Sequence, residues 1–209
     1  MENATKNWEQ MTYPFFNLKL NYALDALEPS IDSKTMRAHY ELILESYIKN
    51  LNEILESRLE LQNMTLCELY DYAKVNQDNL LSEQVGGVYN HFFYFTGLRP
   101  STGQIVIGIT PQATQKITSN FGGWKEFKQK FAETGLNLAG SGCVWLIKND
   151  NNGLEIITTT NQNIPENCTP VLCLDIWEHA YFCKHLNSRQ AYIDAFWNII
   201  DWVKFSEKI

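Results

Sequence analysis

An acidic residue and a histidine stand four positions apart near the C-terminal end of the sequence. The apolar run 171–174 is typical of a buried strand and leads directly into Asp175, and His179 follows with Glu178 beside it. Aromatic residues surround both, at Trp177, Tyr181 and Phe182. A carboxylate and an imidazole are side chains that bind metal ions. Their spacing therefore predicts part of a metal site.

Two further histidines, His39 and His91, lie in similarly apolar surroundings. Burying an imidazole without a partner is costly, and for a single histidine the commonest explanation is a core residue hydrogen-bonded to the backbone. Three such histidines together with Asp175 favour a metal site instead. Neutral imidazoles with one carboxylate suit iron, manganese or zinc, and the absence of cysteine from the set argues against a structural zinc site.

A predicted helix over residues 34–61 positions His39. Ser33 is a suitable N-cap, and apolar residues recur at helical spacing along the segment. His39, Ile43 and Tyr47 are each separated by four residues, so they lie on one face of this helix.

A second predicted helix, at residues 88–96, positions His91. It follows a break at 62–63, a short segment at 65–75 and the pair Gly86-Gly87. Two helices with a modest connection form a hairpin, in which His39 and His91 could face each other.

The second half of the chain predicts a mixture of helices and strands beyond a boundary at 97–100. Helices are expected at 111–121, opened by Thr110-Pro111, at 124–134, ended by Gly135, and at 188–204. Strands are expected at 144–148, 154–159 and 171–176, the first two joined by a turn at 150–153. The sequence thus predicts an α+β fold, in which an N-terminal helical-hairpin lobe precedes an α/β lobe with a three-stranded antiparallel sheet. The expected divisions are an N-terminal extension (1–17), the helical-hairpin lobe (18–99) and the C-terminal lobe (100–209).

Composition limits the remaining classes of function. With 209 residues, of which 44% are hydrophobic and 13% aromatic, the chain can bury a sizeable core. Its net charge of −7 argues against a nucleic-acid partner, and no apolar run approaches the roughly 20 residues needed to cross a membrane. The N-terminus looks like neither a secretory signal nor a transit peptide, so a cytoplasmic protein is expected. The five cysteines, which include no C-x-x-C pair, are expected to be free buried thiols.

The segment from Asp175 to Tyr181 resembles the D-x-W-E-H-A-Y signature of iron and manganese superoxide dismutases. Further blocks match the family in order and spacing from about Leu18 to Trp202, namely Leu24 to Pro29, His39 with Tyr47-x-x-x-Leu51-Asn52, Asn90-His91, Gly140 to Gly142 with Trp145, and Phe196 to Trp202. The resemblance implies one manganese or iron ion per subunit, with water or hydroxide as a fifth ligand and four protein ligands, His39, His91, Asp175 and His179. Such an enzyme converts superoxide to oxygen and hydrogen peroxide while the metal alternates between trivalent and divalent states. Tyr47 and Gln162 match the residues that hold the bound solvent.

The position of the glutamine in this resemblance bears on the metal. Typical iron enzymes of the family carry it on the second helix, where this chain has Gly87, whereas typical manganese enzymes carry it after the second strand, where this chain has Gln162. Hydrogen bonding to bound solvent shifts the redox potential, so the origin of the glutamine affects which metal works. Manganese is therefore favoured, although Tyr94 is similar to the iron branch.

Glu178 is similar to the family glutamate that reaches across a dimer interface to the ligand histidine of the other subunit, here His179. The alternative is a surface acid on a turn. An acid next to a candidate ligand in an apolar stretch favours the first interpretation, which implies a homodimer through the Glu178/His179 region.

Three positions near the active-site entrance depart from the family pattern. Ile43 and Leu44 replace common histidines, and Phe182 replaces the tyrosine that hydrogen-bonds the first of these histidines from the partner subunit. Ile43 and Phe182 thus replace both partners of one hydrogen bond of the family with apolar residues. This is expected if neither polar group could be left buried without the other. We interpret this as a paired replacement, with the hypothesis that the outer link of the proton relay is absent.

Two further departures affect the pocket. Leu42 replaces a common lysine, which leaves Arg189 as the clearest candidate to attract superoxide. Cys143 replaces a pocket tryptophan, which should loosen packing beside the metal or expose a thiol to peroxide.

These departures keep other functions open. Some relatives, including mitochondrial ribosomal homologues, keep the fold as structural proteins after losing ligands, so a metal-binding paralogue with weak or no activity and an interaction role is the main alternative. A non-haem oxygenase would need open coordination positions, and the third histidine leaves little room for them. Retention of all four ligand positions favours catalysis.

Overall fold

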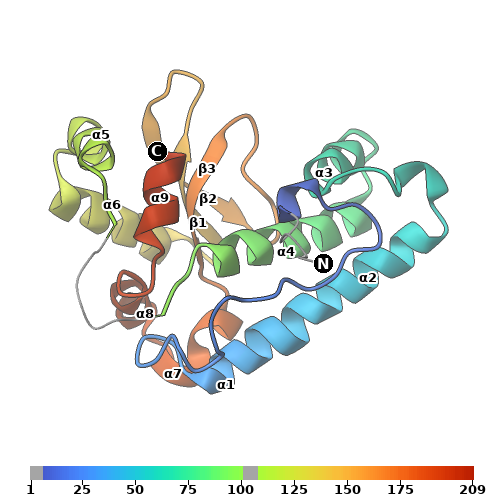
Figure 1. Ribbon diagram of the computed structural model, residues 1–209, viewed down its shortest axis with the longest axis horizontal. Coiled ribbons are helices and arrows are strands. Elements are labelled where there is room, and N and C mark those ends of the chain that lie inside the picture. The colour runs from blue at the N-terminus through green and yellow to red at the C-terminus, as the bar shows by residue number, and fades with distance from the viewer. Residues whose placement is uncertain (1–6, 101–107) are drawn as a thin grey trace, which may run out of the picture.

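The computed structural model describes residues 7–100 and 108–209 (Figure 1). Parts of two expected divisions, residues 1–6 of the extension and 101–107 of the C-terminal lobe, lie outside the described residues. The strands are β1 (Gly142–Lys148), β2 (Leu154–Thr160) and β3 (Thr169–Asp175). The helices are η1 (Trp8–Gln10), α1 (Ser33–Met36), η2 (Arg37–Leu44), α2 (Glu45–Glu56), η3 (Leu59–Leu61), α3 (Leu66–Val75), α4 (Asn79–Thr96), α5 (Pro111–Phe121), α6 (Trp124–Asn137), η4 (Glu178–Ala180), α7 (Phe182–His185), α8 (Arg189–Phe196) and α9 (Trp202–Lys208). The α+β prediction is confirmed.

The first arm of the helical hairpin is formed by α1, η2 and α2, which follow one another without a break. Its N-cap is Asp32 rather than the expected Ser33, because the Asp32 carboxylate accepts a hydrogen bond from the backbone N–H of Thr35 at 2.8 Å. The middle segment, η2, has π-helical geometry. The arm ends at Glu56, earlier than expected, since the backbone leaves the helical region at Arg58.

The second arm, α4, begins at Asn79 rather than at residue 88, and Asp78 caps it by accepting from the backbone N–H of Leu81 at 3.0 Å. Gly86 and Gly87 therefore lie inside the helix. A Cβ atom on Gly86 would lie 1.8 Å from the backbone oxygen of Gln162, and neighbouring Gly87 is similarly crowded by a side chain of α2. The two glycines mark a close approach of other segments to the helix, whereas the sequence-based prediction placed them just before its start.

The sheet has three strands in the order β2-β1-β3. Both pairings are antiparallel, as predicted. Strand β3 packs on α4 and α9, whereas β1 and β2 pack on α6. Strand β1 pairs on both sides and is buried along nearly its whole length. The end of β3 is thereby brought to the hairpin, with Asp175 directly opposite Cys143 of β1.

Two helix predictions in the C-terminal half differ from the structure. Helix α6 runs through Gly135 to Asn137, and this glycine serves close packing, since a Cβ atom there would lie 3.1 Å from Val144 Cγ2. The expected closing helix is split into α8 and α9. Between them the backbone N–H of Asp201 donates to the oxygen of Gly97 at 2.8 Å, which ties this stretch to the end of the hairpin and interrupts the helix.

The described part of the N-terminal extension packs on the hairpin. Trp8 is buried and meets Tyr89 and Phe92 edge-on, with ring centroids 5.4 and 5.8 Å apart. The backbone of buried Phe15 is held by Asn52, whose Oδ1 accepts from the Phe15 N–H at 2.9 Å. Trp8 and Phe15 therefore belong to the core of the protein, although they lie in the predicted N-terminal extension.

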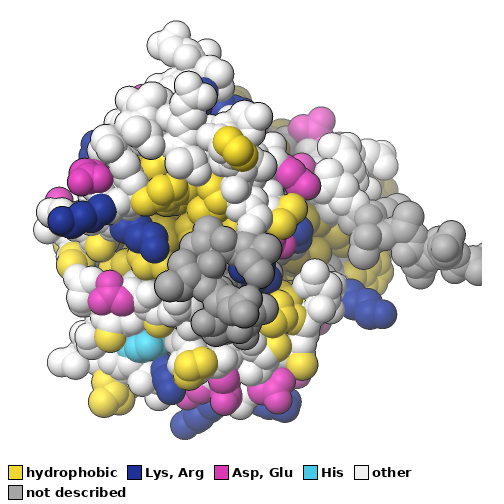
Figure 2. All heavy atoms as spheres, turned by 60° about the vertical axis from the view of Figure 1, so that its left-hand side comes forward, with side chains coloured by type: hydrophobic (Ala, Val, Ile, Leu, Met, Phe, Trp, Pro, Cys, Tyr) yellow, Lys and Arg dark blue, Asp and Glu magenta, His cyan; other side chains and the backbone are white. Residues whose placement is uncertain are grey.

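The surface mixes residue types. On the face that carries α5 and α6, lysine and arginine side chains are interspersed with acidic and hydrophobic ones (Figure 2). All five cysteines are free, as predicted, but burial is confirmed only for Cys143 and Cys173. None of the helices within residues 7–100 and 108–209 combines the length and apolar character that crossing a membrane requires.

Candidate metal centre

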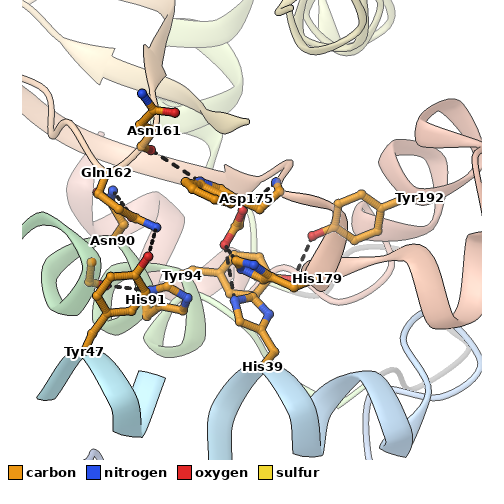
Figure 3. A network of polar contacts seen from close by, with 12 residues as sticks. His39, Tyr47, Asn90, His91, Tyr94, Asn161, Gln162, Asp175, His179 and Tyr192 are labelled. Atoms are coloured by element: carbon orange, nitrogen blue, oxygen red, sulfur yellow. Dashed lines mark hydrogen bonds and ion pairs between the residues drawn. The ribbon is translucent and has the colours of Figure 1, made fainter. Parts of the chain in front are cut away.

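Four side chains from three separate stretches of the sequence meet where the hairpin touches the sheet (Figure 3). His39 comes from η2, His91 from α4, Asp175 from the end of β3 and His179 from η4. One potential ligand atom from each lies within 4.8 Å of the others. The structure thus brings together the four residues expected to bind the metal.

Asp175 lies between two of the histidines. The backbone N–H of Trp177 donates to its Oδ1 at 2.8 Å. Its Oδ2 lies 3.2 Å from His39 Nε2 and 3.3 Å from His179 Nε2. The backbone therefore holds one carboxylate oxygen while the other faces the imidazoles.

The histidine nitrogens test whether a cation fits this cluster. His91 Nδ1 lies 2.5 Å from the backbone oxygen of Gly87, and because a carbonyl only accepts, this nitrogen is the donor and Nε2 carries a lone pair. Nε2 of His91 is buried without a hydrogen-bond partner, as is Nε2 of His39, whose approach to Asp175 lacks hydrogen-bond geometry. Unpartnered buried nitrogens are costly, and a cation bound by their lone pairs would remove that cost. The donor set therefore fits a metal ion.

The protonation states of His39, His91 and Asp175 also fit a metal site. Burial lowers the pKa of His39 to about 4 and that of His91 to about 3. Burial alone would raise the pKa of Asp175, but His179 and His39 beside it bring that pKa below its ordinary value. Neutral imidazoles beside an ionised carboxylate are the forms that bind a metal cation.

Aromatic rings enclose the cluster. Tyr94 stacks on the His39 ring with centroids 5.4 Å apart, and Trp177 stacks on His179 at 5.5 Å. The Tyr94 hydroxyl is hydrogen-bonded to that of Tyr192 at 2.9 Å, so its polar end is satisfied inside the core. These ring contacts hold the imidazoles of His39 and His179 in place.

The expected solvent-binding pair, Tyr47 and Gln162, also lies at this site. Gln162 Nε2 donates to the Tyr47 hydroxyl at 3.0 Å, and Gln162 Oε1 accepts from Asn90 Nδ2 at 3.0 Å (Figure 3). Asn90 therefore fixes which end of the Gln162 amide faces Tyr47. The Tyr47 ring in turn lies 5.4 Å from the ring of His91.

Sequence reasoning gave Asn90 and Gly86 no role in this site. The available signal was the position of Asn90, directly before the candidate ligand His91. Adjacent residues on a helix point in different directions, so Asn90 could contact a residue near the metal site other than a ligand. The purpose of Gly86, which admits the Gln162 backbone, depends on a contact between distant segments and has no local signal.

The residues that depart from the family pattern occupy different environments. Leu44 is fully buried, whereas Ile43 is partly exposed and Phe182 is exposed. Arg189 donates through its guanidinium to the backbone oxygens of Gly135, Leu138 and Gly140, and so fastens the end of α6.

Cys143 is buried rather than open to solvent. Its interaction with Cys173, together with burial, raises the pKa of the Cys143 thiol well above its ordinary value. A protonated, enclosed thiol reacts slowly with peroxide, so of the two expected consequences of Cys143 the exposed thiol was wrong.

Comparison with known families gives two matches. Residues 15–99 match the family described as iron/manganese superoxide dismutases, alpha-hairpin domain. Residues 109–208 match the family described as iron/manganese superoxide dismutases, C-terminal domain. Together the two matches include nearly all the described chain, with the hairpin, the sheet and the four-residue cluster. The chain therefore belongs to the iron/manganese superoxide dismutases, oxidoreductases that act on superoxide.

Proposed function

We propose that this protein converts superoxide to oxygen and hydrogen peroxide at one manganese or iron ion per subunit. The observation that carries the proposal is the cluster of three imidazoles and one carboxylate, whose ligand atoms lie within 4.8 Å of one another. In this proposal the ligands are His39, His91, Asp175 and His179. A bound ion of either metal would supply one-electron chemistry, taking an electron from one superoxide and giving it to a second.

The protein's own residues would fix the ligand geometry. Asp175 is held by the backbone N–H of Trp177 at 2.8 Å, and His91 by the carbonyl of Gly87 at 2.5 Å. Such contacts behind the ligands orient them and set the tautomer of the imidazole.

Tyr47 and Gln162 would hold and deliver protons, of which peroxide formation consumes two. Because Gln162 Nε2 donates to the Tyr47 oxygen, the hydroxyl hydrogen of Tyr47 is free to point elsewhere. Burial raises the pKa of Tyr47, so the phenol keeps its proton at neutral pH. We infer that this proton is available to the reacting oxygen species.

We propose manganese over iron as the working metal. Gln162 enters the site from the segment after β2, and the Tyr47 ring occupies the space above Gly87 of α4, which supports this assignment. Comparing superoxide removal by manganese-loaded and iron-loaded samples tests it. Higher activity with iron at equal occupancy would contradict the choice.

We propose a homodimer through the Glu178/His179 region. Three large apolar side chains are exposed on adjoining elements near His179, namely Leu42 of η2, Phe182 of α7 and Leu186 just after α7. Exposed apolar patches mark interaction sites. Sedimentation of the wild type and of Phe182→Asp tests this, since the charge should shift the protein towards monomer, and a wild type that sediments as a monomer would contradict it.

The test of function combines metal analysis with superoxide removal. Asp175→Asn keeps the shape of the side chain but removes its charge, so both metal content and activity should fall sharply. Asp71→Asn on α3 is the matched control, because this aspartate is exposed and away from the cluster. A folded, metal-free and inactive wild type would favour a structural role instead.

A further inference from the structure

Tyr70 of α3 contacts the segment that carries Gln162, although the four candidate ligands come from other elements. Tyr70 is fully buried. Its hydroxyl donates to Asn163 Oδ1 at 3.1 Å and accepts from the backbone N–H of Ile164 at 3.4 Å. One buried side chain therefore holds the two residues that directly follow Gln162.

The segment is also held before Gln162, where the backbone N–H of Asn161 donates to the backbone oxygen of Ser141 at 2.9 Å. Gln162 thus lies between this backbone contact on one side and the contacts of Tyr70 on the other. Its place in the site is fixed from both directions along the chain.

Asn90 links the backbone of this segment to the Gln162 side chain. Its Nδ2 donates to Gln162 Oε1 at 3.0 Å and to the backbone oxygen of Asn163 at 3.4 Å. The two hydrogens of the amide can serve one acceptor each. The alignment of Asn90 with Gln162 therefore depends on where the Asn163 backbone lies, and Tyr70 holds that backbone.

We propose that Tyr70 is a positioning residue, which fixes the backbone of residues 163–164 and thereby aligns the Gln162 amide beside the metal centre. The inference rests on the proposed function, because that function assigns the cluster a metal ion. By family resemblance Gln162 holds solvent at this ion, and donation by its amide favours the more negative form of that solvent, which accompanies the higher oxidation state. A misaligned Gln162 should therefore raise the reduction potential.

Three variants isolate this role. Tyr70→Phe removes one oxygen and keeps the buried ring, so Asn163 Oδ1 loses its donor and the Ile164 N–H loses its acceptor. Asn163→Ala breaks the same contact at an exposed residue, so it should fold even if Tyr70→Phe does not. Tyr72→Phe is the matched control, because it removes a tyrosine hydroxyl from the partly exposed face of the same helix.

The first measurement needs neither metal nor turnover. Two-dimensional amide NMR of the metal-free protein records the side-chain signals of Gln162, which are assigned by their loss in Gln162→Glu. Tyr70→Phe and Asn163→Ala should both move these signals, whereas Tyr72→Phe should leave them as in the wild type. Unmoved signals in both site variants would overturn the proposal.

The second measurement is a redox titration of the manganese-loaded protein. At a fixed applied potential, the ratio of divalent to trivalent ion should rise on the order of threefold in Tyr70→Phe, less than for a residue that touches Gln162 itself. Adding Asn163→Ala should change this ratio little, because both substitutions break one contact. Equal potentials in Tyr70→Phe and Tyr72→Phe, or additive shifts in the double variant, would overturn the proposal.

The two levels of the argument fail separately. If the loaded wild type does not remove superoxide, the proposed function is overturned. The amide signals of the metal-free protein would still decide whether Tyr70 positions Gln162.

Discussion

Gly87 leaves room for the ring of Tyr47, so replacing this glycine should disturb the site without touching a ligand. A Cβ atom at position 87 would lie 2.3 Å from Tyr47 Cδ1 and 2.6 Å from Cγ. Both atoms are near the base of the side chain, where the ring cannot easily swing away. Relieving the overlap must therefore move Tyr47 or the helix.

The expected size of the effect follows from two opposing terms. In an unobstructed helix alanine is more stabilising than glycine by about 0.5–1 kcal/mol. Overpacking typically costs about 1–3 kcal/mol, and the depth of this overlap places Gly87→Ala in the upper part of that range. The net result should be destabilisation of the metal-free protein by about 1–2 kcal/mol.

A double-mutant cycle separates these terms. In a Tyr47→Ala background the obstructing ring is gone, so Gly87→Ala should stabilise the protein by about 0.5–1 kcal/mol. Urea unfolding of the four metal-free proteins, followed by circular dichroism, measures both changes. Destabilisation of equal size in both backgrounds would refute the reasoning. Gly87→Ala should also slow superoxide removal in the metal-loaded protein, because a displaced Tyr47 would lose its hydrogen bond from Gln162.

Three further outcomes are expected. Asn90→Ala should lower superoxide removal by roughly tenfold or more at unchanged metal content, because Gln162 loses the donor that orients its amide, and an unaltered rate would show that Asn90 does not position Gln162. The hydrogen bond from Arg58 lowers the pKa of Asp78, so this pair stabilises the fold above the ordinary aspartate pKa of about 3.9 and loses its effect as pH falls through the lower folded value. Asp78→Asn keeps an N-cap but removes the charge, so the free energy of unfolding should fall less steeply at acid pH. The difference should be at most about 1 kcal/mol because the pair is partly exposed. A pH dependence identical to wild type in urea unfolding would contradict this. Ile43→His and Phe182→Tyr together should change the proton-consuming half-reaction more than the sum of the single changes in pulse radiolysis, and additive effects would count against a paired replacement.

Much of the fold could be predicted because its signals are local. The Thr110-Pro111 start of α5 is encoded in adjacent residues, and its helix begins where expected. The turn between β1 and β2 is equally local. By contrast, the start of α4 was missed because Gly86 and Gly87 are strong breakers in isolation, and only their contacts with Gln162 and Tyr47 explain them.

The candidate site also combines features with local sequence signals and features that depend on contacts between distant segments. The four clustered side chains were predicted from their types and from resemblance, and the structure places them together. Two contacts could not be predicted, because each joins segments that are distant in sequence. They are the hydrogen bond from Asn90 to Gln162 and the hydrogen bonds from Arg189 to backbone oxygens.

The central claim is that one redox metal ion, held by His39, His91, Asp175 and His179, removes superoxide. Its most direct test is the rate of superoxide decay in pulse radiolysis, measured on samples whose metal content is varied and determined. The rate should rise in proportion to occupancy, reach its maximum at one ion per chain and vanish in metal-free protein. A rate that does not depend on metal content, or a protein that binds no ion at this cluster, would contradict the claim.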